Sequence, residues 1–229
     1  MLSFQINYSQ KTVKMVVEYG SKSEDMNSLM SFQNIEVENL SFESPEIVGK
    51  YYEVNLKEYK KGKLVSSKNL IDLKLVDYLK IDSTHTTFKF FSKIENDKMT
   101  VFVETQTMSS SKKTFKLQKG KGADYVLKDF QGNKKFVDVP INEEFPILAI
   151  ITPVKHEDGY SSYCEVAQSG VAPEKFGEKF KIPHYFVITM KFKYKYPKYD
   201  QVIFLFSFFY SLTQNFTRML TKFRWQSHK

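Results

Sequence analysis

The sequence predicts a mainly β protein: an antiparallel sandwich or barrel with one or two short helices and an apolar C-terminal tail compatible with a helix. Three observations support this fold class. Apolar and polar residues alternate from residue 12 to about residue 193, and short strand-like runs follow one another at roughly ten-residue spacing. Phenylalanine and tyrosine number 21 and 14 among 229 residues, and such flat side chains favour a pleated surface. Helical periodicity is confined to short segments.

The clearest element is a hairpin over residues 87–106 with a two-residue turn at Asn96-Asp97. Both turn residues tolerate a left-handed backbone. In this register one face is largely apolar, and the other face carries two pairs of opposite charge, as cross-strand energetics favour. The predicted facing pairs are Ile94–Met99, Ser92–Val101, Phe90–Val103, Phe88–Thr105, Glu95–Lys98, Phe91–Phe102 and Lys89–Glu104.

A second hairpin is predicted over residues 49–67, with its turn at Lys61-Gly62. Residues 145–152 (FPILAIIT) are apolar on both faces of a strand, which predicts a central buried strand closed by Pro153. The remaining predicted strands are 12–19, 32–37, 114–117, 125–130, 135–139, 163–166 and 185–193.

Two short helices are expected. Ser21 and Glu24 have the spacing of a capping box, which predicts a helix over residues 21–30. Residues 173–180 predict a short connecting helix with Phe176 and Phe180 on one face. Residues 69–79 are compatible with either a helix or a strand.

Charge is distributed unevenly along the chain. The net charge is +8, yet residues 190–229 alone carry eight basic residues and one acid, so the rest of the chain is nearly neutral. Arginine, which supplies most base-specific contacts, occurs only at Arg218 and Arg224. The composition therefore disfavours nucleic-acid binding. We expect an N-terminal segment over residues 1–11, one β domain over 12–193 and a basic, apolar tail over 194–229.

The ends of the chain leave alternatives open. Residues 201–217 lack any charge and are nearly all apolar over 202–212, although a spanning helix needs about 20 such residues. The tail is interpreted as a membrane-associating helix, as a segment packed on the body, or as translation past the natural end of the gene. Residues 1–11 are either an ordinary polar start or the remnant of a signal peptide that begins upstream. Export to the periplasm or cell envelope is mildly favoured, with a cytoplasmic location left open.

No motif names a reaction. Cys164 with His156 or His184 is the one thiol–base combination, oriented by Glu165 or Asp158, but position 164 falls in a predicted strand where a buried role is usual. The sequence at 156–158 (His-Glu-Asp) reads as a solvated turn, and residues 119–122 as a hairpin loop rather than a phosphate cradle. We therefore expect no catalytic residue, metal or cofactor.

The run from Lys191 to Tyr199 is the most suggestive for binding, because it alternates cations and rings. Such a strand can engage an anionic polymer or a sugar. The favoured interpretation is nevertheless a lysine-fringed strand, for instance at a sheet edge. The ligand-binding candidates are Lys191, Lys193, Tyr194, Lys195 and Tyr196.

These observations favour a non-enzymatic β-sandwich or barrel that binds a protein, a glycan or a small hydrophobic ligand in the cell envelope or outside it. Two alternatives stay open. One is a membrane-tethered structural subunit that uses residues 202–220. The other is an enzyme whose site is assembled from residues far apart in the sequence.

Overall fold

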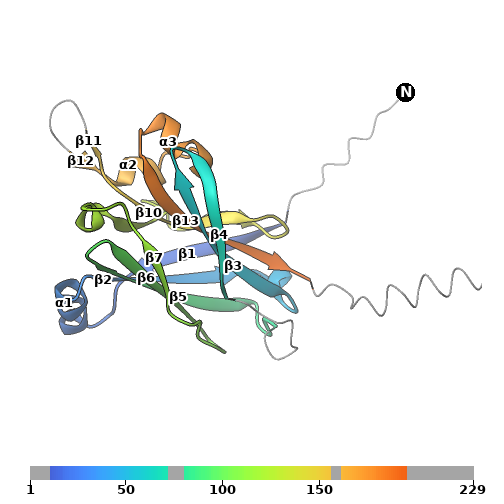
Figure 1. Cartoon of the computed structure of the whole chain (residues 1–229). Coiled ribbons are helices and arrows are strands. Elements are labelled where there is room, and N and C mark those ends of the chain that lie inside the picture. Colours follow the sequence, from blue (N-terminus) through green and yellow to red (C-terminus); the bar gives the residue numbers. More distant parts are fainter. Residues whose placement is uncertain (1–10, 72–79, 156–160, 195–229) are drawn as a thin grey trace, which may run out of the picture. The chain divides into compact units, whose positions relative to one another are not determined.

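A computed structural model of the chain describes residues 11–71, 80–155 and 161–194. These residues form two antiparallel sheets that face each other (Figure 1). The first sheet has six strands. In spatial order they are β7 (Lys113–Lys116), β6 (Lys98–Thr105), β5 (His85–Glu95), β2 (Ile35–Glu43), β1 (Thr12–Tyr19) and β9 (Val137–Pro140).

The second sheet has five strands, and each sheet ends in two edge strands. The described residues therefore form a sandwich, which decides between the two architectures that the sequence leaves open. Its strands in spatial order are β4 (Lys63–Ile71), β3 (Tyr51–Lys60), β13 (His184–Lys193), β10 (Phe145–Ile151) and β8 (Val126–Asp129); a separate small ladder joins β11 (Val154–Lys155) to β12 (Ser161–Ser162).

Both predicted hairpins are confirmed. Strands β5 and β6 meet at the predicted Asn96-Asp97 turn, where Asn96 has a φ of 54°, and all seven predicted facing pairs are observed. Strands β3 and β4 turn at Lys61-Gly62, both with positive φ, and β4 continues to Ile71. Residues 72–79, the rest of the ambiguous 69–79 segment, lie outside the described residues.

Three local predictions are wrong. Residues 163–166 were expected as a strand, but α2 (Cys164–Ala167) is helical there. Phe32 was expected to begin a strand, whereas it ends helix α1 (Glu24–Phe32), and β2 begins at Ile35. The cap of α1 is Ser23 rather than Ser21, because the Ser23 hydroxyl accepts the Met26 amide.

The main core lies between the two sheets, and Phe42 on β2 is at its centre. Its ring lies 5.6 Å from Phe88 of the same sheet. It also lies 5.4 Å from Phe192 and 6.3 Å from Phe145, both of the opposite sheet, measured between ring centroids. All four rings are buried. Edge-to-face contacts of this kind add to the free energy of apolar burial.

A second buried cluster covers the outer face of the five-stranded sheet. It explains why residues 145–151 are apolar at every position: Leu148 and Ile150 face the main core, whereas Ala149 and Ile151 face the second cluster. The covering segments include α2 and two further short helices, η4 (Pro173–Lys175) and α3 (Phe176–Lys179). As predicted, Phe176 and Phe180 are in contact, with ring centroids 5.8 Å apart.

The loop before β8 packs tightly against the β5–β6 turn. A Cβ atom placed on Gly122, the first residue of the short helix η3 (Gly122–Asp124), would lie 1.7 Å from the Asn96 carbonyl oxygen. We expect Gly122→Ala to lower the free energy of unfolding by about 2–3 kcal/mol, because the backbone must shift. Urea denaturation measures this. Gly120→Ala, where nothing lies within 4 Å, is the control and is expected to cost only the strain of its positive φ, about 1 kcal/mol.

Contacts between residues divide the chain into two units, residues 1–194 and 195–229. All strands and helices described above belong to the first unit. Both short helical segments expected from the sequence, residues 21–30 and 173–180, belong to this first unit. The short helix η1 (Pro45–Ile47), which precedes β3, belongs to it as well.

Candidate functional site

The ligand-binding candidates of the sequence lie at the end of β13 and after it. Lys191 and Lys193 belong to β13, and Tyr194 follows it directly. Lys195 and Tyr196 lie outside the described residues. The structure thus places three of the five candidates along one strand end, and ligand binding by this run stays a prediction.

Two of these side chains have partners within the fold. The Lys193 ammonium donates to the Glu53 carboxylate over 2.8 Å, and this bond lowers the pKa of Glu53. The ring of Tyr194 lies 3.1 Å from the buried Lys50 Nζ atom, measured to the ring centroid. The interpretation of this run as an edge strand is wrong, because β13 lies between β3 and β10.

The thiol–base candidates do not form a described site. Cys164 begins α2, and residues 156–160, which include His156 and Asp158, lie outside the described residues. His184 instead joins a buried chain of hydrogen bonds that the sequence did not reveal. Its Nδ1 atom lies 2.7 Å from the Tyr125 hydroxyl, and its Nε2 atom lies 3.1 Å from the Glu58 carboxylate.

This Tyr–His–Glu chain resembles a proton relay in connectivity only. Burial raises the pKa of Tyr125 to about 12 and lowers the pKa of His184. Tyr125 therefore keeps its proton near neutral pH and is a poor nucleophile. Tyr125 and His184 are 3% and 6% exposed. The chain joins β3, β13 and the loop before β8.

Two carboxyl groups of β2 point between the sheets. Glu36 and Glu38 share the inward face of the strand with Leu40 and Phe42. The Glu36 carboxylate accepts the Leu127 amide over 2.7 Å. Burial, reinforced by the charges of Asp129 and Glu36, raises the pKa of Glu38 to about 8. Alternation along β2 was a signal available in the sequence, because it places both acids in the core-facing positions.

Within the part of the chain that the structure describes, no group of three or more histidine, cysteine, aspartate or glutamate residues is arranged to hold a metal ion. Glu38 is a buried acid and Glu36 a partly buried one. Their measurable consequence is a dependence of stability on pH.

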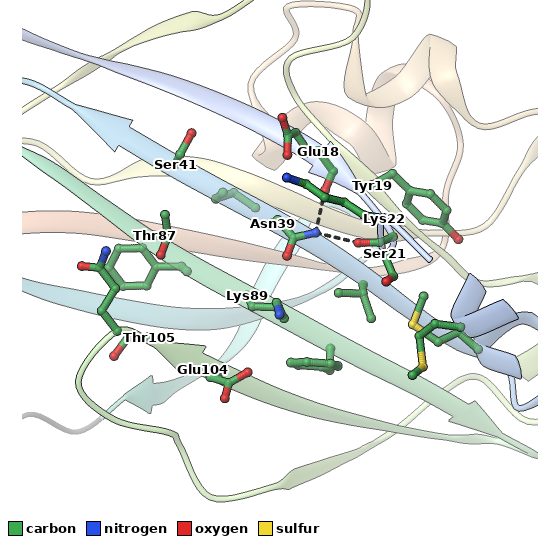
Figure 2. A pocket seen from close by; sticks show the side chains of 18 of the residues that line it. Glu18, Tyr19, Ser21, Lys22, Asn39, Ser41, Thr87, Lys89, Glu104 and Thr105 are labelled. Atoms are coloured by element: carbon green, nitrogen blue, oxygen red, sulfur yellow. Dashed lines mark hydrogen bonds between the residues drawn. The ribbon is translucent and has the colours of Figure 1, made fainter. Parts of the chain in front are cut away.

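A groove with a volume of about 1110 Å³ lies on the outer face of the six-stranded sheet (Figure 2). Its floor is formed by outward-facing residues of β1, β2, β5 and β6, and helix α1 with the loop before it lies along one end. We call this feature the α1 groove. Its polar lining includes Glu18, Lys22, Asn39, Thr87, Lys89 and Glu104.

Local hydrogen bonds hold α1 in place beside the sheet. The Asn39 side-chain amide donates to the carbonyl oxygens of Glu18 (3.2 Å) and Gly20 (2.8 Å), which fixes the loop that leaves β1. The Asn27 side chain accepts the Ser21 amide over 2.7 Å and donates to the Ser21 carbonyl over 2.8 Å. Gly20 has a φ of 75°, a conformation that favours glycine.

The two ends of the α1 groove differ in chemistry. The end beneath the helix is apolar and is lined by Met26, Met30, Val37 and Phe91. Phe91 packs on Phe102, with ring centroids 5.6 Å apart. The remaining floor is polar and carries charges of both signs.

The charged residues of the groove do not neutralise one another. Glu18, Lys22, Lys89 and Glu104 are exposed, and none of them forms an ion pair with another described residue. Lys89 and Glu104 lie directly opposite each other on β5 and β6. The sequence predicted this pairing but not its place in a groove.

Comparison with known protein families, with curated proteins and with solved structures finds no match to this chain. None of the helices in the described ranges has the length and apolar character required to cross a bilayer.

Proposed function

We propose that this chain is a non-enzymatic binding module and that the α1 groove holds its ligand. The observation that carries the proposal is an asymmetry of the sandwich. The outer face of the five-stranded sheet is covered by a second apolar cluster, whereas the described residues leave a groove beside α1 on the outer face of the six-stranded sheet. A concave surface with an apolar end and a few polar groups is the usual form of a binding site.

The sheet edges also support binding through this face. Each edge is protected against pairing with a further strand, which leaves a sheet face as the surface for a ligand. Strands β7, β8 and β9 each have four residues, and Pro140 ends β9. Glu36 caps the Leu127 amide of β8. Strand β4 is longer, but its pairing with β3 has two register shifts, and it carries Lys63 and Lys68. Short strands, proline, lysine and bulges all discourage strand addition.

The proposal predicts that ligands perturb the groove and are blocked by filling it. A mixed screen of monosaccharides, fatty acids, nucleotides and short peptides is added to the ¹⁵N-labelled full chain, and amide shifts are recorded. We expect shifts to cluster at Asn39, Thr87 and Lys89. The Thr87→Trp variant, which fills the floor of the groove, is expected to weaken binding at least about tenfold.

The matched control is Ser67→Trp, which adds the same bulk to exposed β4 in the other sheet. It is expected to bind as the unmodified chain does. Equal binding by the Thr87→Trp variant, or shifts that cluster outside the groove, would refute the proposal. Conversion of any bound compound, seen in its own resonances, would contradict the non-enzymatic part.

A further inference from the structure

We infer that the ligand of the α1 groove is a polypeptide segment of another protein. The segment places an apolar side chain beneath α1 and presents charged groups of both signs to the rest of the floor. This inference rests on the proposed function, since it names the class of ligand for the same site.

The charge pattern of the groove favours a polypeptide over other polymers. Glu18 and Glu104 are negative and Lys22 and Lys89 are positive, and all four are exposed. A nucleic acid or an anionic membrane complements positive groups only and is repelled by the two glutamates. A neutral glycan complements neither sign. A polypeptide carries carboxylate and ammonium groups together and can meet both.

Helix α1 and the residue Tyr19 before it carry several exposed apolar side chains, of which Tyr19 and Met26 also line the groove. Met26, Leu29 and Phe32 are 48%, 53% and 81% exposed, and Tyr19 beside them is 68% exposed. No residue of α1 is buried, so among the described residues these apolar side chains keep much of their surface exposed. Methionine and aromatic residues are enriched where proteins bind proteins, and methionine adapts to varied side chains.

The shape of the groove agrees with this class of ligand. Small-molecule sites are typically clefts or cavities of about 300–1000 Å³, and the α1 groove, at about 1110 Å³, lies above this range. Because the sheet edges are protected, as described above, the segment is held by side chains across the sheet face rather than by added strand pairing.

The first experiment selects random peptides displayed on phage against the immobilised full chain. Synthetic copies of the selected peptides are labelled, and their dissociation constants are measured by fluorescence polarisation. We expect Met26→Glu to weaken binding at least about tenfold, the loss typical of a central contact. Leu64→Glu, at a residue of similar exposure (51%) on β4, makes the same change elsewhere and is expected to leave binding unchanged.

The second experiment reverses the facing charges of β5 and β6. Lys89→Glu and Glu104→Lys are each expected to weaken the selected peptides, and the double variant is expected to stay weak. The reason is that the ligand's charges then meet like charges at both positions. If Lys89 and Glu104 served only each other, the double variant would regain full affinity, and that result would overturn the inference.

The outcomes separate the inference from the proposed function. If sugars or fatty acids bind the groove and selected peptides do not, the inference is overturned while the binding function stands. If the full chain self-associates and Met26→Glu abolishes this in light scattering, the occupant is a second copy, which also overturns the inference. If no compound binds the groove, the proposed function itself fails.

Discussion

Replacing Phe42 with alanine is expected to lower the free energy of unfolding by about 3–5 kcal/mol, because the change leaves a cavity at the junction of the two sheets. The Phe42 ring is fully buried and contacts Phe88, Phe145 and Phe192. Proteins of this kind have about 5–15 kcal/mol of total stability, so the loss is a large share. Urea denaturation followed by circular dichroism measures it.

The control for this change is Phe136→Ala. Phe136 is 43% exposed, and its ring has one long cation–π contact, 5.3 Å from Lys14 Nζ. We expect a loss below about 1 kcal/mol. Equal losses at positions 42 and 136 would show that the two sheets do not meet through Phe42.

The second large effect concerns the buried acid of β2. Glu38→Gln is expected to raise the free energy of unfolding by about 2–4 kcal/mol at pH 8, because glutamine mimics the protonated acid and cannot ionise. Glu38 is 3% exposed. Burial and the neighbouring charges of Asp129 and Glu36 raise its pKa from 4.5 to about 8. Each pKa unit corresponds to about 1.4 kcal/mol.

The sign of the pH dependence follows from proton linkage. Between pH 4.5 and about 8 the folded state holds a proton on Glu38 that the unfolded state has lost. The contribution of Glu38 therefore falls as the pH rises through this window and is most favourable below it. The gain from Glu38→Gln is expected to vanish near pH 4 and to level off above pH 8.

Thermal denaturation between pH 4 and pH 9 tests this expectation. The matched control is Glu43→Gln, a change on the same strand at a side chain that is 63% exposed. It is expected to shift stability by less than about 1 kcal/mol at every pH. A Glu38→Gln variant that is less stable than the unmodified chain at pH 8 would show that the ionised carboxylate is stabilised in the folded state.

Much of the fold could be predicted from the sequence, because its strands follow simple alternation. The β5–β6 hairpin is the clearest case, since Asn96-Asp97 sets the turn and the turn sets every pair that follows. The apolar run of β10 was likewise recognised as buried on both faces. Which strands flank β10, and which helices cover it, depends on contacts between distant segments, and local patterns do not encode these contacts.

The errors have physical causes. Residues 163–166 alternate in polarity like a strand, yet four residues fit one helical turn equally well, and α2 packs Val166 into the second cluster. Ser21 has the spacing of a cap, but its hydroxyl accepts the Ser23 amide instead. Periodicity over so few residues does not separate these alternatives.

The candidate site was the least predictable part. The run from Lys191 to Tyr199 is recognisable in the sequence because its residues are adjacent. The α1 groove instead combines residues of β1, α1, β2, β5 and β6. Helix α1 beside it also follows a pattern that normally indicates core, since Met26, Leu29 and Phe32 recur at helical spacing. The exposure of these side chains depends on the position of α1 relative to the sheet.

The protected sheet edges have a wider consequence for how this chain meets other molecules. A bare strand accepts almost any extended backbone, so proteins that associate through it discriminate poorly between neighbours. Here the described strands at each margin are short, bulged or capped. If the proposed binding function holds, a partner is therefore recognised by side chains on a sheet face, and we expect single substitutions there to change its affinity.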